Sequence, residues 1–86
     1  MKFTLPTLII ATLAAAPVFA EPECEGEGPM QPLWQTVKSF EDAEGSVEVA
    51  KLTGDGCYEI YGHQNGHKVE IYYDPRTGAE LDREED

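Results

Sequence analysis

Positive charge is scarce in this sequence. Its 86 residues include six Lys and Arg against 17 Asp and Glu, which gives a formal net charge of −11 at pH 7. Nucleic acids and anionic membrane surfaces attract proteins through basic patches that neutralise phosphate. The shortage of basic residues argues against both as partners. It leaves cationic partners, divalent metals and simple solubility as explanations of the acidity.

The sequence also lacks an apolar run of the roughly 20 residues that a membrane span requires. Its first 20 residues instead combine a basic tip at Lys2, an apolar stretch from Phe3 to Val18, and a small residue, Ala20, before acidic sequence. These are the three parts of a cleavable secretory signal. We therefore expect residues 1–20 to be removed and the mature protein to be periplasmic or secreted, without membrane insertion.

Cysteine is rare as well. Removal of residues 1–20, which carry one positive charge, leaves 66 residues with a formal charge of −12, enough for one domain. The two cysteines, Cys24 and Cys57, lack the close spacing of a redox pair. In an oxidising compartment they favour one intramolecular disulfide. Two free thiols and an intermolecular link remain the alternatives.

The beginning of the mature chain lacks the residues of a packed element. Residues 21–30 form an acidic lead segment, in which residues 21–28 are only Glu, Pro, Gly and one Cys. Residues 31–86 form the folded domain. Order in the lead segment is expected to depend on the disulfide.

A helical pattern follows the lead segment. Between Pro29 and Glu44, Leu33, Val37 and Phe40 recur at helical spacing. Proline suits the first turn of a helix, and a glycine often ends one in the left-handed conformation. The segment predicts one amphipathic helix of about three turns, with Pro32 in its first turn and Gly45 as its stop.

The rest of the chain has strand and turn signals. Residues 46–52 alternate and then slip by one residue, which predicts a bulge around Val49–Ala50. Residues 57–62 and 67–73 flank Asn65–Gly66, a strong hairpin signal. Residues 79–82 suit a short last strand, and residues 83–86 a frayed end. These segments predict an α+β fold with one amphipathic helix packed on a three- to four-stranded antiparallel sheet.

The hairpin register follows from the two-residue turn. It pairs Ile60 with Ile71 on an apolar face that the helix covers, because a slip of one residue would move every side chain to the other face. The opposite face then pairs Glu59 with Tyr72 and Tyr61 with Glu70. These four residues make an aromatic and acidic face, which is the candidate binding site. Cross-strand packing without a binding role is the alternative interpretation.

Three consecutive stretches carry a family resemblance. They are Gly56–Tyr61 (GCYEIY), Asn65–Tyr73 (NGHKVEIYY) and Asp74–Leu81 (DPRTGAEL). In order and spacing they resemble the PepSY domain family, and with the preceding helix the similarity covers most of residues 32–82. The resemblance implies an exported binding module that inhibits or regulates a peptidase or another envelope protein.

The same residues leave other functions open. An acidic periplasmic protein that binds a cation or another ligand is the alternative, and self-association through sheet edges is a third interpretation. His63 and His67 are expected on opposite faces of the hairpin, so one metal ion cannot take both. The alternating Glu residues of the lead segment lack the geometry that calcium needs. The sequence predicts no metal site and no cofactor.

Catalytic chemistry has little support in the sequence. A nucleophile must lie within hydrogen-bond reach of an oriented base. Ser39 and Ser46 are expected near the end of the helix, whereas both histidines cluster at the hairpin tip. We therefore expect a non-enzymatic domain with a protein partner.

Overall fold

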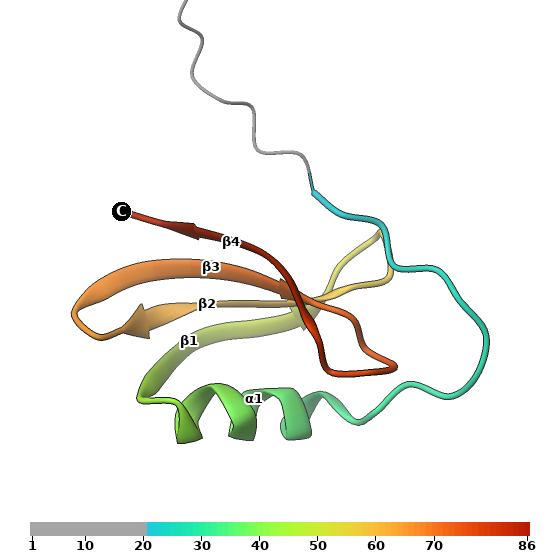
Figure 1. Cartoon of the computed structure of the whole chain (residues 1–86), viewed down its shortest axis with the longest axis horizontal. Coiled ribbons are helices and arrows are strands. Elements are labelled where there is room, and N and C mark those ends of the chain that lie inside the picture. Colours follow the sequence, from blue (N-terminus) through green and yellow to red (C-terminus); the bar gives the residue numbers. More distant parts are fainter. Residues whose placement is uncertain (1–20) are drawn as a thin grey trace, which may run out of the picture.

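The computed structural model of the protein describes residues 21–86, so the expected signal peptide lies outside the described residues. The elements in chain order are α1 (Leu33–Asp42), β1 (Gly45–Leu52), β2 (Tyr58–Gln64), β3 (His67–Tyr73) and β4 (Glu80–Glu85). The helix packs on one face of a four-stranded antiparallel sheet, mainly against β1 (Figure 1). The predicted α+β fold is confirmed. Within the described part of the chain, no helix has the length and apolar character that crossing a membrane demands.

The helix is shorter than the predicted segment. It begins after Pro32, which lies just outside the first turn with extended backbone (φ −65°, ψ 144°). A residue that precedes a proline avoids the helical conformation, which disfavours a helix that runs from Pro29 through Gln31. Leu33, Val37 and Phe40 face the sheet as their spacing predicts.

The end of the helix differs from the prediction. Gly45 is expected as the left-handed stop, but Glu44 takes that conformation, with φ of 71°, and Gly45 begins β1. Glycine is needed at position 45 for another reason. A Cβ there would lie 2.4 Å from a carbon of the Phe40 ring. Gly45 therefore allows the chain to turn into the sheet directly against a buried aromatic side chain.

The central hairpin has the predicted register. Asn65 and Gly66 both have positive φ, 54° and 82°, as a two-residue type I′ turn requires. Ile60 pairs with Ile71 across the two strands, and Gln64 pairs with His67 next to the turn. The turn residues alone therefore determine which side chains face the helix.

The irregularity in β1 lies earlier than predicted. The pairing shifts between Val47 and Val49, not at Val49–Ala50. After the shift, Ala50 lies opposite Ile60 on the helix side of the sheet, and Lys51 lies opposite Glu59 on the other side. The bulge thus restores the alternation of apolar residues on the helix side and polar residues on the other side, which the sequence pattern of residues 46–52 interrupts.

The predicted frayed C-terminus is wrong, because β4 continues to Glu85. Arg83 holds this strand in place. Its guanidinium lies 2.9 Å from a carboxylate oxygen of Glu80 and 2.8 Å from one of Glu85. It also donates a 2.9 Å hydrogen bond to the Gln64 side chain on β2. The charged residues 83–86 suggest a solvated tail, but most of them belong to a strand that is paired with β3.

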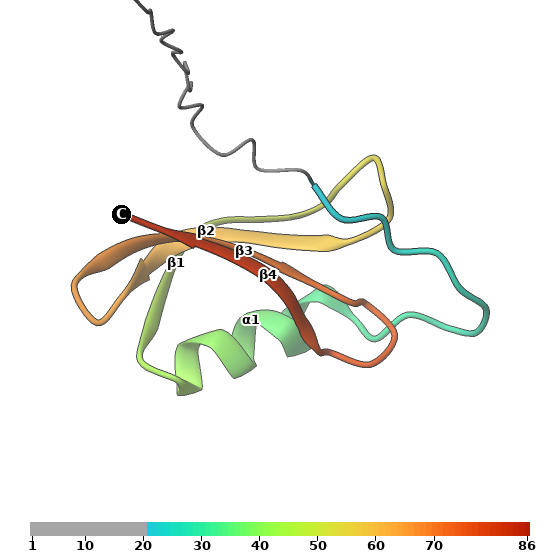
Figure 2. The same ribbon diagram turned by 45° about the horizontal axis from the view of Figure 1, so that its top comes forward.

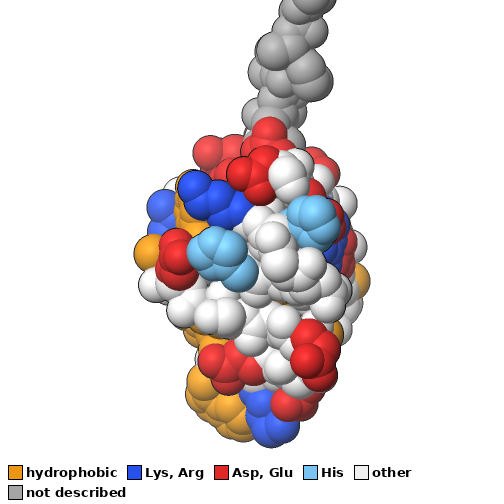
Figure 3. Space-filling view, turned by 90° about the vertical axis from the view of Figure 1, so that its left-hand side faces the viewer, with side chains coloured by type: hydrophobic (Ala, Val, Ile, Leu, Met, Phe, Trp, Pro, Cys, Tyr) orange, Lys and Arg blue, Asp and Glu red, His pale blue; other side chains and the backbone are white. Residues whose placement is uncertain are grey.

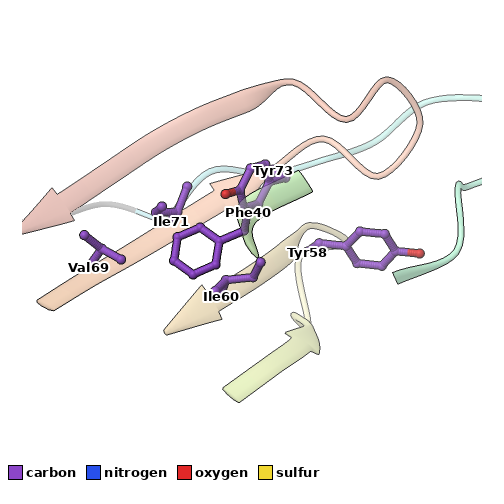
Figure 4. Packing of buried hydrophobic residues seen from close by; sticks show 6 residues of the cluster. All are labelled: Phe40, Tyr58, Ile60, Val69, Ile71 and Tyr73. Carbon is purple, nitrogen blue, oxygen red and sulfur yellow. The ribbon is translucent and has the colours of Figure 1, made fainter. Parts of the chain in front are cut away.

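The core lies between the helix and the sheet (Figure 4). Ile60 and Ile71 are fully buried on the same face, and the Phe40 ring from the helix packs against them. The prediction that the single helix covers the apolar face of the sheet is therefore confirmed. The cluster of buried side chains consists of Phe40, Tyr58, Ile60, Val69, Ile71 and Tyr73.

Candidate functional site

The four candidate residues occupy the sheet face away from the helix, which we call the outer face. Glu59 pairs with Tyr72 and Tyr61 with Glu70, in the predicted register. Because side chains alternate along a strand, all four point to the side opposite Ile60 and Ile71.

The outer face is only partly open. Tyr61 is 38% exposed and Glu70 is half-buried, whereas Glu59 is 3% and Tyr72 only 1% exposed. A partner at the surface reaches Tyr61 and Glu70 but not the two deeper side chains. The open face that the alternation suggests is therefore limited to its half near the hairpin turn.

The lead segment covers the other half. Cys24 and Cys57 form a disulfide, as predicted, and Tyr72 is buried in one cluster with them. The Cys24 amide donates a 2.9 Å hydrogen bond to the carbonyl oxygen of Asp55. Figures 1 and 2 show the lead segment passing from this side of the sheet around its end to the helix. The lead segment has no helix or strand, yet it forms part of the surface around the candidate residues.

Further contacts attach the lead segment to the turn after β3. Arg76 donates a 3.1 Å hydrogen bond from Nε to the Gly28 carbonyl oxygen. The Gln31 amide donates to the Pro75 carbonyl oxygen at 2.8 Å, and the Tyr58 hydroxyl donates to the Gln31 carbonyl oxygen. Sequence reasoning missed these contacts because they join residues that are far apart in the chain.

A lysine that sequence reasoning also missed completes the buried cluster. The ammonium of Lys51 lies 3.7 Å from Oε1 of Glu59 and 5.8 Å from the centroid of the Tyr61 ring. The Tyr72 hydroxyl donates a 3.0 Å hydrogen bond to Glu70. Oε2 of Glu59 is buried and has no hydrogen-bond partner among residues 21–86. Only the position of the β1 bulge reveals that Lys51 faces this cluster.

The pKa values of the two carboxyl groups, Glu59 and Glu70, are shifted in opposite directions. Burial raises the pKa of Glu59, and the neighbouring Glu70 raises it further. Interaction with the Glu59 carboxyl lowers the pKa of Glu70. Burial, followed by the two carboxylates, raises the pKa of Tyr61 to about 12, so its phenol is neutral at pH 7. Glu70 is thus the group that ionises first, and Glu59 retains a proton to higher pH.

This difference predicts a pH-dependent stability. The pKa of Glu59 is higher in the folded than in the unfolded state, so protonation of Glu59 stabilises the fold. This contribution to the free energy of unfolding is fully present below the ordinary carboxyl pKa of 4.5 and is lost as the pH rises through the raised folded-state pKa. A tenfold change in proton affinity between the unfolded and folded states is worth about 1.4 kcal/mol. Urea denaturation between pH 4 and 8 should therefore show a Glu59→Gln variant gaining stability over the wild type as pH increases. The exposed Glu25→Gln variant in the lead segment is the control, and an equal gain in both would contradict the assignment.

Toward the hairpin end, the outer face is hollowed. This acidic hollow has a volume of ≈ 290 Å³. Figure 3, which views the hairpin end, shows acidic side chains at the upper margin, on the side away from the helix. All four strands contribute to the lining, which consists of Glu48, Tyr61, Gly62, Lys68, Val69, Glu70, Glu84, Glu85 and Asp86.

The two histidines lie at the rim of this region on different sides of the hairpin. His63 is paired with Lys68, and its Nδ1 lies 3.3 Å from Oε2 of Glu48. His67 Nδ1 lies 3.1 Å from the Asp86 carbonyl oxygen. In the part of the chain that the structure describes, no group of three or more His, Cys, Asp or Glu side chains converges in a way that suits a metal ion.

The strand pairing also brings a serine next to a histidine. Ser46 lies opposite His63, although the sequence suggests that serines and histidines are apart. The side chains of His63 and Glu48 are 47% and 57% exposed. Water surrounds an exposed base and weakens its electrostatic effect on a nucleophile. The arrangement resembles a surface ion pair more than an activated nucleophile.

Comparison with known proteins identifies the family. A family model described as the peptidase propeptide and YPEB domain, PepSY, matches residues 4–84. The chain belongs to the PepSY family. The match includes the helix, β1 to β3 and all of β4 except its last residue, together with the disulfide and all four candidate residues of this PepSY domain. Comparisons with curated proteins and with solved structures gave no significant match. PepSY domains are propeptide-like modules that are generally non-catalytic.

Proposed function

We propose that this PepSY domain is a non-catalytic binding module, periplasmic or secreted, that inhibits or regulates a peptidase or another envelope protein. The family relationship supports a propeptide-like role. The secretory pattern of residues 1–20 and the disulfide support export to an oxidising compartment. The proposed contact surface is the outer face, with Tyr61 and Glu70 as the candidate residues that reach solvent.

The observation that carries this proposal is the contrast between the two halves of the outer face. The lead segment packs on Tyr72 through Cys24, and Glu59 is buried beside Tyr72, whereas Tyr61 remains 38% exposed beside the acidic hollow. A half-exposed aromatic ring at the edge of a concave surface can anchor a partner, since tyrosine provides much contact area at low entropic cost.

Affinity retention tests the proposal. The full chain is immobilised and exposed to an extract of the envelope and culture medium of the cells that produce it. We expect one protein to be retained by the wild type and by Trp34→Ala, an exposed change on the helix, but not by Tyr61→Ala. If the retained protein is a peptidase, adding the free domain should lower its activity. Equal retention by all three variants would remove the outer face from the proposal.

The acidic hollow favours a second candidate function, binding of a cation or another small ligand. Calorimetric titration of the full chain with calcium and with zinc tests this alternative. Heat of binding that disappears in Glu48→Gln would support it. No heat with either ion would eliminate it for these metals and leave the protein partner as the proposed ligand.

A further inference from the structure

The acidic hollow contains carboxylates that the fold does not neutralise. Arg83 is paired with Glu85, and His63 lies beside Glu48. Glu84, by contrast, has no ion pair or side-chain hydrogen bond among residues 21–86 and is exposed. Lys68 is the one Lys or Arg in the lining. The lining as a whole therefore attracts positive charge.

A buried carboxyl group adjoins this hollow. Glu59 is 3% exposed, and its Oε2 has no hydrogen-bond partner among the described residues. Its carboxyl interacts with Glu70 and Tyr61, both of which line the hollow. A buried polar atom without a partner costs free energy, so its presence in a native structure needs an explanation. Glu59 thus lies behind the wall of the hollow, beside the two lining residues, Tyr61 and Glu70, that a ligand can reach.

The protein itself shows which cation suits this wall. The Lys51 ammonium approaches both the Tyr61 ring, at 5.8 Å from its centroid, and Oε1 of Glu59, at 3.7 Å. An aromatic face combined with a carboxylate recognises organic ammonium or guanidinium groups. Lys51 does not line the hollow, whereas Tyr61 does. The surface of Tyr61 in the hollow is therefore available to a cation from another molecule.

We propose that the acidic hollow binds lysine or arginine side chains from an extended basic segment of the partner protein. This inference rests on the proposed function, because it specifies the chemistry of the partner at the outer face. A volume of ≈ 290 Å³ is at the small end of ligand sites and suits one or two long side chains. Carboxylates from separate strands are spread along the surface, which matches several charges carried by one extended chain.

Titration of the full chain with an acetylated hexalysine peptide tests the inference. The wild type should bind it with an affinity that falls as salt increases, because the attraction is between exposed charges. Replacing Glu48 and Glu84 together by Gln should weaken binding about fivefold, because each exposed ion pair with the peptide contributes little by itself. Lys68→Gln, which removes the competing ammonium, should strengthen it by about twofold.

The matched control changes the same net charge elsewhere. Glu25 and Glu27 are exposed in the lead segment, and replacing both by Gln should leave the affinity unchanged. An equal loss in this control would show that net charge alone attracts the peptide, and the inference would be wrong. Absence of hexalysine binding by the wild type would also overturn it. Retention of a partner that depends on Tyr61 would in that case leave the proposed function intact.

Discussion

Replacing Phe40 by alanine is expected to remove a large part of the free energy of unfolding of this domain. Phe40 is 2% exposed and is the one helix residue in the core cluster of buried side chains. Phe→Ala changes in cores cost about 3–5 kcal/mol, and a chain of 66 residues has a total stability of about 3–10 kcal/mol. The substitution therefore removes the main contact between the two layers. Far-UV circular dichroism during urea denaturation measures the loss.

Trp34→Ala is the control for this prediction. Trp34 lies on the same helix and is larger than Phe40, but it is 64% exposed. Its replacement should change the free energy of unfolding by less than about 0.5 kcal/mol. A urea midpoint that is the same in both variants would contradict the assignment of Phe40 to the joint between helix and sheet.

Replacing both cysteines by serine is the second change with a large expected effect. The disulfide closes a loop with a sequence separation of 33 residues, for which the chain-entropy relation gives about 3–4 kcal/mol. Serine at position 57 also places a hydroxyl at a site that is fully buried. Urea denaturation should show a much lower midpoint, and hydrogen exchange should show faster exchange at the Cys24 amide, which donates to Asp55.

The same change tests whether the lead segment covers the outer face. Tyr72 is 1% exposed and packs with the two cysteines, so freeing the lead segment should open its ring to solvent. Tyrosine fluorescence quenching by acrylamide reports this exposure. Arg76→Ala, which loses one contact to the lead segment but retains the disulfide, should change quenching little. Quenching that rises equally in the two variants would mean that the disulfide is not the main restraint.

Covering half of a binding face affects the energetics of the proposed contact. A partner at the open half does not need to displace the lead segment, because Tyr61 and Glu70 already reach solvent. Preorganised side chains lose little entropy on binding. The disulfide therefore has two effects on one surface, since it stabilises the domain and limits which candidate residues a partner meets.

The hairpin was predictable because its determinants are local. Asn65 and Gly66 accept the positive φ of a two-residue turn, and the turn then dictates the pairing of every residue along β2 and β3. The placement of Glu59, Tyr61, Glu70 and Tyr72 on the outer face follows from that pairing. The family resemblance rests on the same short stretches, which explains why it was also visible.

Errors arose where contacts join distant parts of the chain. Residues 83–86 look like a frayed tail because a charge run usually remains solvated, yet Arg83 pairs with Glu80, Glu85 and Gln64. Glu44 instead of Gly45 takes the left-handed conformation, and glycine is needed at position 45 because the Phe40 ring leaves no room for a Cβ there. Lys51 reaches Glu59 only through the actual position of the bulge.

Patterns along the chain were enough to predict the class of fold, the register of the central hairpin and the face on which the candidate residues lie. Those properties depend on turn residues and on side-chain alternation, whereas the alternatives for the two cysteines were decided in favour of an intramolecular disulfide only by the structure. The depth at which each candidate is buried, the open half of the outer face and the position of the acidic hollow were visible only in the folded chain. The burial of the candidate residues depends on segments that are far apart from them in sequence, here the lead segment and β4. The periodicity of side chains along one segment does not show which other segment packs on it.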